Sequence, residues 1–396
     1  MAARKSTLSH VWKSCFHAAC MVLVVFAHGI SSTASAEGFD TKAKHAIIID
    51  SRSGKVLFEK DADELFPPAS MSKVMTMLMI FERLESGRLK ETDEFKISEN
   101  AWRRGGAPSG SSSMYAILDS RVAISDLIQG VIVQSGNDAA ITLAEGVAGT
   151  EERFAQDMTA RARELGLAKS VFKNATGLPD EGHVSTAREL ASLTRYLIEV
   201  FPQYYKFYSQ PEFTWNKITQ QNRNPLLGNY EGADGVKTGY IKESGYGMIG
   251  SAERNGRRLI VVASGMKSKR ERGEEAEKLL NYGFTKFRPI RLYAAGDTIG
   301  QARVWGGEQS TVRIVAKEDI NTLLSDDEKA TAEARLVYQG PLKAPIKAGV
   351  EIGSVNILSD GKLISKAPVY TKESIEETES IWKRALDSAL FMALGG

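Results

Sequence analysis

Residues 70–85 are apolar on nearly every face, and this segment most restricts how the chain can fold. Its sequence is SMSKVMTMLMIFERLE, and it follows Pro67-Pro68, a pair that ends extended structure. A helix that is apolar all round is buried at the centre of a domain. The sequence therefore predicts a core helix over 70–85, with the polar residues Ser70 and Lys73 in its first turn.

Strand and helix patterns surround this segment. Strands are predicted at 45–50, 55–59, 246–252 and 258–263, and further helices at 123–133, 138–147, 151–165, 187–200 and 269–282. Turn residues join the strands of each pair, Ser53-Gly54 in the first and Asn255-Gly256 in the second. Strands at both ends with helices inserted between them predict an α+β domain on an antiparallel sheet.

The pattern changes after Pro289, where short runs separated by glycine-containing turns predict a small all-β domain. We therefore expect four parts in the chain. They are a signal peptide over 1–36, the α+β domain over 37–286, a β-rich domain over 287–372 and an amphipathic helix over 373–396.

The first 36 residues have the order of a secretory signal peptide. Arg4, Lys5 and Lys13 precede an apolar run over 18–27, and Ala-Ser-Ala follows at 34–36 as a small-x-small cleavage site. About ten apolar residues are too few to span a bilayer, which needs roughly 20. We expect cleavage after residue 36 and export of the mature protein.

Composition excludes several classes of protein. The chain of 396 residues has 51 Lys and Arg against 49 Asp and Glu, and a formal net charge of +2 gives no reason to expect a nucleic-acid partner. Both cysteines, Cys15 and Cys20, leave with the signal, and only His45 and His183 remain after it. This excludes disulfides, thiolate catalysis and a zinc site built on histidine and cysteine, so we expect neither a metal nor a cofactor.

Ser70 and Lys73 form an S-x-x-K tetrad one helical turn apart. A serine is a poor nucleophile until a base takes its proton, and a lysine can be that base only if desolvation and nearby positive charge lower its pKa. The helix N-terminus also directs N–H groups at an oxyanion. The same tetrad occurs at 264–267 and 359–362, but neither copy opens a buried helix.

Two further motifs follow along the chain. Ser-Gly-Asn at 135–137 lies on a short turn between predicted helices, unlike the S-x-N matches at 98–100 and 354–356. Lys-Thr-Gly at 237–239 occurs once, at the start of a predicted strand. Such a strand can pair with an extended peptide, to which the lysine offers a positive charge and the glycine close approach. Alone, this tripeptide fits a surface hairpin equally well.

The order S-x-x-K, S-x-N, K-T-G is far more specific than any one motif. With these motifs the chain resembles the exported D-alanyl-D-alanine carboxypeptidases, which are low-molecular-mass penicillin-binding proteins, over essentially the whole mature chain. The resemblance implies a penicillin-recognising serine transferase fold of the β-lactamase type. It also implies removal of the terminal D-Ala from peptidoglycan stem peptides ending in D-Ala-D-Ala, through an acyl-enzyme, and acylation by β-lactam antibiotics.

The resemblance also implies roles for individual residues. They are Ser70 as nucleophile, Lys73 as general base, Ser135, Asn137 and Lys237 as proton-relay and substrate-holding groups, the backbone N–H groups of Ser70 and Tyr240 as oxyanion hole, Thr238 and Gly239 as substrate-binding residues, and Arg223 and Arg272 as ligands of the terminal carboxylate. For Arg272 a solvated position on a charge-rich helix over 267–278 is the alternative. His183 lies on a loop that borders the family's cleft, without an assigned role.

Other activities stay open on the same fold. A D,D-transpeptidase or endopeptidase differs in what reaches the acyl-enzyme, and a β-lactamase needs a further base for deacylation. E-x-x-L-N at 277–281 fits the lactamase pattern but follows Lys237, so we interpret it as a coincidence. A Ser-His-Asp triad with His45 or His183, and a non-catalytic wall-binding protein, are further alternatives. G-x-G-x-x-G at 245–250 precedes a strand and not a helix, which argues against a nucleotide site.

Residues 374–394 predict a terminal amphipathic helix, with Trp382, Leu386 and Leu390 on its apolar face. We expect this face to lie in a membrane surface, which would make the protein peripheral on the periplasmic face of the inner membrane. A helix docked on the protein's own core is the alternative. The segment is net acidic, so its attachment would depend on apolar contact.

Overall fold

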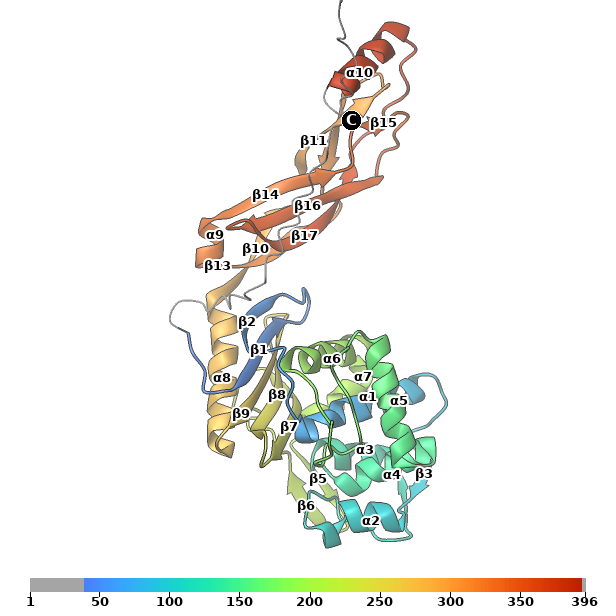
Figure 1. The fold of residues 1–396 in the computed structure, drawn as a ribbon, viewed down its shortest axis with the longest axis vertical. Helices are drawn as coiled ribbons and strands as arrows, with labels where there is room; N and C mark the ends of the chain where they lie inside the picture. The colour runs from blue at the N-terminus through green and yellow to red at the C-terminus, as the bar shows by residue number, and fades with distance from the viewer. Residues whose placement is uncertain (1–38, 394–396) are drawn as a thin grey trace, which may run out of the picture. The chain divides into compact units, whose positions relative to one another are not determined.

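The computed structural model describes residues 39–393, and its first part is a five-stranded antiparallel sheet in the order β2-β1-β9-β8-β7 (Figure 1). The strands are β1 (His45–Asp50), β2 (Val56–Lys60), β7 (Ala233–Ile241), β8 (Gly245–Arg254) and β9 (Arg257–Met266). Both predicted hairpins are present, and the two ends of this part of the chain meet where β1 pairs with β9. The predicted signal peptide lies outside the described residues.

The sheet is buried on both faces, which explains the uninterrupted apolar run in β1. Successive side chains of a strand point to opposite faces. Ile47 and Ile49 lie in the core beneath the inserted helices, whereas Ala46 and Ile48 lie in a second core on the other face. Helix α8 (Lys269–Lys286) covers that second face, as Figure 1 shows.

The helical region lies between β2 and β7 in the sequence, and α1 forms its centre. Its helices are α1 (Lys73–Glu85), α2 (Glu99–Gly105), α3 (Ile124–Ile132), α4 (Asn137–Ala148), α5 (Glu151–Glu164), α6 (Ala187–Val200) and α7 (Pro202–Tyr205), with 3-10 turns at Ala69–Ser72, Ala107–Ser109 and Lys206–Ser209. Two short antiparallel strand pairs also lie in this region. One is β3 (Glu94–Lys96) with β4 (Arg121–Ala123), which come before and after α2 in the sequence, and the other is the hairpin of β5 (Glu212–Trp215) and β6 (Ile218–Gln221). Every residue from Lys73 to Phe81 is buried, as the apolar pattern predicted.

The remaining strands form a β-rich region with its own apolar core. A six-stranded sheet has the order β14-β16-β17-β12-β11-β15, and β10 pairs with β13. The elements are β10 (Phe287–Tyr293), β11 (Thr298–Trp305), β12 (Thr311–Val315), β13 (Ile320–Ser325), α9 (Asp326–Ala330), β14 (Ala332–Tyr338), β15 (Leu342–Lys343), β16 (Glu351–Ser359), β17 (Lys362–Thr371) and α10 (Ile381–Ala393). The α+β class followed by a β-rich region agrees with the prediction.

The terminal helix starts later than the sequence pattern indicated. Ile375 and Glu377 form isolated β-bridges with Ile346 and Gly307, so this stretch is extended and α10 begins only at Ile381. Backbone pairing with the β-rich region therefore overrides the helical periodicity at its start. Within residues 39–393, no helix combines the length and apolar character needed to cross a membrane.

Candidate active site

Lys73 lies at the start of α1 and is fully buried, whereas Ser70, in the 3-10 turn before it, is only partly buried. Lys73 Nζ lies 3.1 Å from Ser70 Oγ, 2.7 Å from Asn137 Oδ1 and 2.6 Å from the backbone carbonyl oxygen of Thr176. The last two atoms can only accept hydrogen bonds. In a neutral amine the two N–H groups are then used by these acceptors, and the lone pair is directed at the Ser70 hydroxyl.

The surroundings of Lys73 favour its neutral form. Desolvation first, and then the positive charge of Arg223, lower the pKa of Lys73, whereas the charges of Glu151 and Asp138 raise it, and the net result is a pKa of about 7. An ordinary lysine is protonated at that pH, whereas this amine is neutral in a large fraction of molecules. A lowered pKa is what Lys73 needs in order to accept the proton of Ser70, as the sequence predicted.

Asn137 contacts Lys73 from the turn between α3 and α4, and Ser135 lies on the same turn. Ser135 has a positive φ of 61°, a backbone conformation that residues other than glycine seldom adopt. Its buried Oγ has no hydrogen-bond partner among residues 39–393. Asn137 accepts from Lys73 through Oδ1 and donates through Nδ2 to Ser111 Oγ at 2.9 Å. The S-x-N motif thus lies beside Lys73, with one serine hydroxyl unpaired.

The Lys-Thr-Gly motif lies on the edge strand β7, next to the turn that carries Ser70. A Cβ on Gly239 would lie 2.9 Å from the carbonyl oxygen of Pro68, so only glycine lets the two backbones approach this closely. Lys237 and Thr238 are buried, whereas Tyr240 is half exposed and packs against Tyr246. The strand therefore borders Ser70 with its free edge.

Arg223 and Arg272 complete a group of cations beside Lys73 and Lys237. Arg272 is only 6% exposed and its Nη2 donates to the Arg223 carbonyl at 3.4 Å, so it is not a solvated residue of a charge-rich helix. Desolvation lowers the pKa of Arg272 to about 10. Desolvation and then the neighbouring cations Lys73, Arg223 and Arg272 hold the pKa of Lys237 well below its usual range. This part of the site suits an anionic group.

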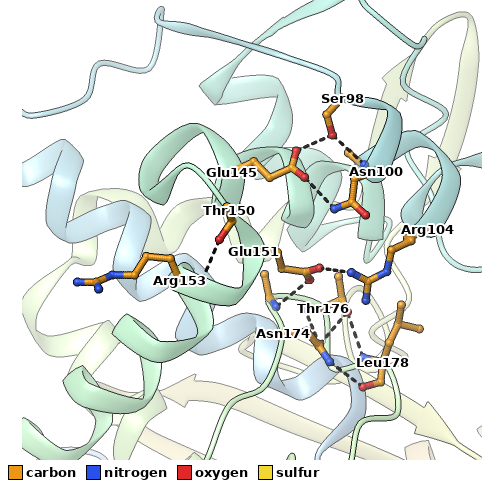
Figure 2. A network of polar contacts seen from close by, with 12 residues as sticks. Ser98, Asn100, Arg104, Glu145, Thr150, Glu151, Arg153, Asn174, Thr176 and Leu178 are labelled. Carbon is orange, nitrogen blue, oxygen red and sulfur yellow. Dashed lines mark hydrogen bonds and ion pairs between the residues drawn. The ribbon is translucent and has the colours of Figure 1, made fainter.

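The loop over 174–178 supplies a contact that the sequence reasoning did not anticipate. The Asn174 side chain accepts from the backbone N–H groups of Thr176 and Gly177 and donates to the carbonyl of Leu178, as Figure 2 shows in part. These bonds fix the Thr176 carbonyl that Lys73 contacts. The acceptor is a main-chain atom, so the only sequence signal is the turn-forming Asn-Ala-Thr-Gly string.

His183 approaches Ser72 and not Ser70. Its Nδ1 accepts the backbone N–H of Lys173 at 3.3 Å, which leaves the proton on Nε2, 2.8 Å from Ser72 Oγ. That hydroxyl donates in turn to the carbonyl of Ala69, and burial lowers the pKa of His183 to about 4. His183 thus braces the turn before α1 as a neutral donor, and this arrangement does not provide a base for a serine triad.

The E-x-x-L-N match is not part of this site. It lies in α8, on the opposite face of the sheet, where Asn281 accepts from Tyr230 at 2.9 Å. A cavity of about 490 Å³ borders the serine turn, between the loop over 177–184 and the end of β7. A substrate could thus extend from Ser70 along the strand edge.

Comparison with known proteins agrees with this geometry. Residues 31–268 match the family model described as D-alanyl-D-alanine carboxypeptidase, and residues 287–377 match the model of the penicillin-binding protein 5 C-terminal domain. The chain is 38% identical over 354 residues to the D-alanyl-D-alanine carboxypeptidase DacC of Escherichia coli, covering 89% of this chain and 88% of that protein. It is 34% identical to DacF of Bacillus subtilis, covering 85% and 86%.

Solved structures give the same result. Penicillin-binding protein 5 from Haemophilus influenzae superposes with a TM-score of 0.75 at 34% identity, covering 86% of this chain and 99% of that chain. Penicillin-binding protein D2 from Listeria monocytogenes, in its ampicillin-bound form, gives a TM-score of 0.57 at 32% identity, covering 62% of this chain and 99% of its own.

Proposed function

This chain belongs to the D-alanyl-D-alanine carboxypeptidase family of penicillin-binding proteins, and we propose that it works through an acyl-enzyme on Ser70. It is a serine-type D-Ala-D-Ala carboxypeptidase that acts on peptidoglycan stem peptides. The observation that carries the assignment of the nucleophile is the set of three contacts at Lys73 Nζ. The acceptors on Asn137 and Thr176 use the two N–H groups of a neutral amine, so its lone pair faces the third contact, Ser70 Oγ.

In the acylation step Lys73 takes the proton of Ser70 as Oγ attacks the carbonyl of the penultimate D-Ala. The negative charge that develops on the carbonyl oxygen is held by the backbone N–H groups of Ser70 and Tyr240. The proton then passes to the amine of the leaving D-Ala through the Ser135 hydroxyl, which has no hydrogen-bond partner among the described residues. Water attacks the resulting ester, and hydrolysis returns Ser70 to its starting state.

The terminal carboxylate of the substrate is bound by Arg223, Arg272 and the Lys-Thr-Gly strand. A carboxylate bound among these cations offsets their mutual repulsion. Its negative charge also raises the pKa of Lys237 and so favours the protonated form of this lysine. Arg272 is well suited to this task because its buried Nε has no partner among the described residues. A bidentate arginine contact also recognises the planar carboxylate by shape.

Arg272→Leu should lower kcat/KM for a peptide ending in D-Ala-D-Ala by about 10- to 100-fold, since a charged hydrogen bond contributes about 1.5–3 kcal/mol. Arg270→Leu is the matched control, because Arg270 lies on the same helix but is exposed and pairs with Glu274. Steady-state D-Ala release gives the two values. Equal kcat/KM in the two variants would exclude Arg272 from carboxylate binding.

The acylation rate should rise with pH through about 7, the pKa of Lys73. Below this pH the ammonium form has no lone pair to receive the Ser70 proton, and above it the neutral amine predominates. Second-order labelling by a fluorescent penicillin, measured from about pH 5 to pH 9, tests this dependence. A rate that is flat across the range would mean that Lys73 is not the base.

Hydrolysis and transpeptidation differ in the molecule that attacks the ester of the acyl-enzyme, which is water in the first reaction and an amine in the second. We propose that water predominates, because the relatives DacC of Escherichia coli and DacF of Bacillus subtilis are both named carboxypeptidases. D-Ala release from a stem-peptide mimic should be unchanged by added D-amino acid, with little exchanged peptide in the mass spectrum. Predominant exchange would favour the transpeptidase. Rapid turnover of penicillin would favour a β-lactamase.

We also propose that α10 attaches the exported protein to the membrane surface. Its polar residues contact the β-rich region, where Asp387 accepts from the N–H of Gly306 and Lys383 donates to the carbonyl of Glu308. Ile381 and Trp382 are 79% and 87% exposed, which leaves apolar side chains available to lipid. The exposure of these two side chains favours the membrane surface over docking on the protein's own core.

Deletion of residues 381–396 should move the protein from the membrane fraction to the soluble periplasmic fraction, with D-Ala release unchanged. Because attachment depends on apolar contact, salt washing should not release the parent protein. Immunoblots of the two fractions provide the measurement. If the deletion variant stays with the membrane, α10 is not the anchor.

A further inference from the structure

Glu151 is a buried carboxylate at the first position of α5, and it contacts the loop that holds Lys73. The side chain is almost completely buried, and its Oε1 accepts the backbone N–H of Ala175 at 3.1 Å. Its Oε2 accepts from Arg104 Nη1 at 2.9 Å. Figure 2 shows Glu151 between Arg104 and this loop. Glu151 thus links Arg104 on α2 to the loop segment that contacts Lys73.

Hydrogen bonds from two elements hold Ala175 and Thr176 of this loop, next to Lys73. The carbonyl of Ala175 accepts from Thr76 Oγ1 at 2.7 Å, one turn along α1 from Lys73. The next carbonyl, that of Thr176, accepts from Lys73 Nζ at 2.6 Å. Glu151 holds the N–H of the same Ala175, so its carboxylate is separated from the Lys73 contact by a single peptide unit.

The helix that carries Arg104 is held at its start by a second carboxylate, that of Glu145. Glu145 on α4 accepts from Ser98 Oγ at 2.5 Å and from Asn100 Nδ2 at 2.8 Å, and these bonds hold the start of α2 (Figure 2). The ion pair of Arg104 with Glu151 is therefore built into the fold. Only the Glu151 end of this ion pair is buried, because the Arg104 side chain is 47% exposed. A side chain needed only to fill this space could be apolar, because burial of a charge lowers stability.

We infer that Glu151 is a positioning residue for the reaction: its carboxylate holds residues 175–176 so that the Thr176 carbonyl orients Lys73 toward Ser70. This inference rests on the proposed roles of Ser70 and Lys73. Without the Thr176 acceptor, the amine could rotate and turn an N–H toward the serine hydroxyl in place of its lone pair. Small misplacements of reacting groups cost large factors in rate.

The charge of Glu151 has a second effect, on the protonation of Lys73. Burial raises the pKa of Glu151, while Arg104 and the Ala175 N–H act in the opposite direction. The charged and titratable groups that face Lys73 or Glu151 are Arg104 on α2, Asp138 and Glu145 on α4, Glu152 on α5, Lys237 on β7, and Arg223 and His183 on loops. Because ionised Glu151 favours protonated Lys73, removal of its charge should make Lys73 neutral at lower pH.

The test compares Glu151→Gln with Glu152→Gln in the mature chain, since Glu152 is the exposed neighbour on the same helical turn. Second-order labelling by a fluorescent penicillin is measured as a function of pH. In Glu151→Gln the labelling rate at high pH, where it no longer changes (the plateau rate), should fall about tenfold or more. The part of the curve in which the rate rises with pH (the acidic limb) should move to lower pH by about half a unit or more. Glu152→Gln should match the parent. A limb at the parent's pH in Glu151→Gln would overturn the inference, because a purely structural loss lowers only the rate.

Glu151→Asp serves if the glutamine variant does not fold. It keeps the charge, so the limb should stay at the parent's pH, but its shorter side chain cannot reach both Arg104 and Ala175, so the plateau rate should fall. An unchanged plateau rate would overturn the inference. Labelling of the parent, with none in Ser70→Ala, shows separately that the proposed nucleophile is correct, so failure of the two ideas can be told apart.

Discussion

Lys73→Met should lower the acylation rate of the enzyme about 1,000-fold, within the range that a general base contributes. Methionine keeps most of the volume of the buried side chain but has no lone pair of comparable basicity directed at Ser70 Oγ. The Asn137 and Thr176 oxygens lose their donor, so some stability is lost as well. The rate of covalent labelling by penicillin, measured on folded protein, gives the effect on chemistry alone.

Lys90→Met is the control for this variant, because Lys90 is an exposed lysine on the loop after α1. It should label at the rate of the parent. Thermal unfolding of the two variants identifies any loss of folded protein. If Lys73→Met labels within tenfold of the parent, the proton of Ser70 is taken by another group.

Gly177→Ala should reduce D-Ala release at least 100-fold, since misplacement of the groups around a nucleophile has large effects on rate. A Cβ at this position would lie 1.9 Å from the carbonyl oxygen of Ala69, the residue before Ser70. No rotation of a side chain can relieve a contact with backbone. Either the serine turn or the loop that presents Thr176 must move, and each movement disturbs the contacts of Lys73.

Gly166→Ala separates this clash from the cost of the backbone conformation. Gly166 has a φ of +79°, close to the +76° of Gly177, but a Cβ there meets nothing within 4 Å. Both substitutions place alanine in the left-handed region at a cost of about 1–2 kcal/mol. Only Gly177→Ala should lose activity beyond that expected from stability. Similar D-Ala release by the two variants would show that the close approach to Ala69 is unimportant.

The sequence predicted the parts of the fold and site that depend on side-chain pattern. The buried helix α1, the hairpin of β8 and β9 and the three motifs were recognisable because apolar periodicity and residue identity carry that information. The family resemblance then predicted roles for the other site residues. Arg272 was ambiguous because its helix is rich in charge, and only the packing of α8 against the sheet buries this residue.

Contacts made by the backbone could not be predicted in the same way. The Thr176 carbonyl would be available from any residue type, so its identity carries no signal. Glu151 was visible only as the start of a helix, and its contact with Ala175 joins segments that the sequence does not relate. The extended stretch before α10 was misassigned for a similar reason, because its pairing partner Ile346 is distant in sequence.

Locating the penicillin adduct tests the central claim most directly. Mature protein is acylated with benzylpenicillin and digested, and the modified peptide from the start of α1 is sequenced by tandem mass spectrometry. This peptide contains both Ser70 and Ser72, and only Ser72 contacts His183. We predict an adduct on Ser70 that is absent from Ser70→Ala. An adduct on Ser72, or D-Ala release that persists in Ser70→Ala, would contradict the account.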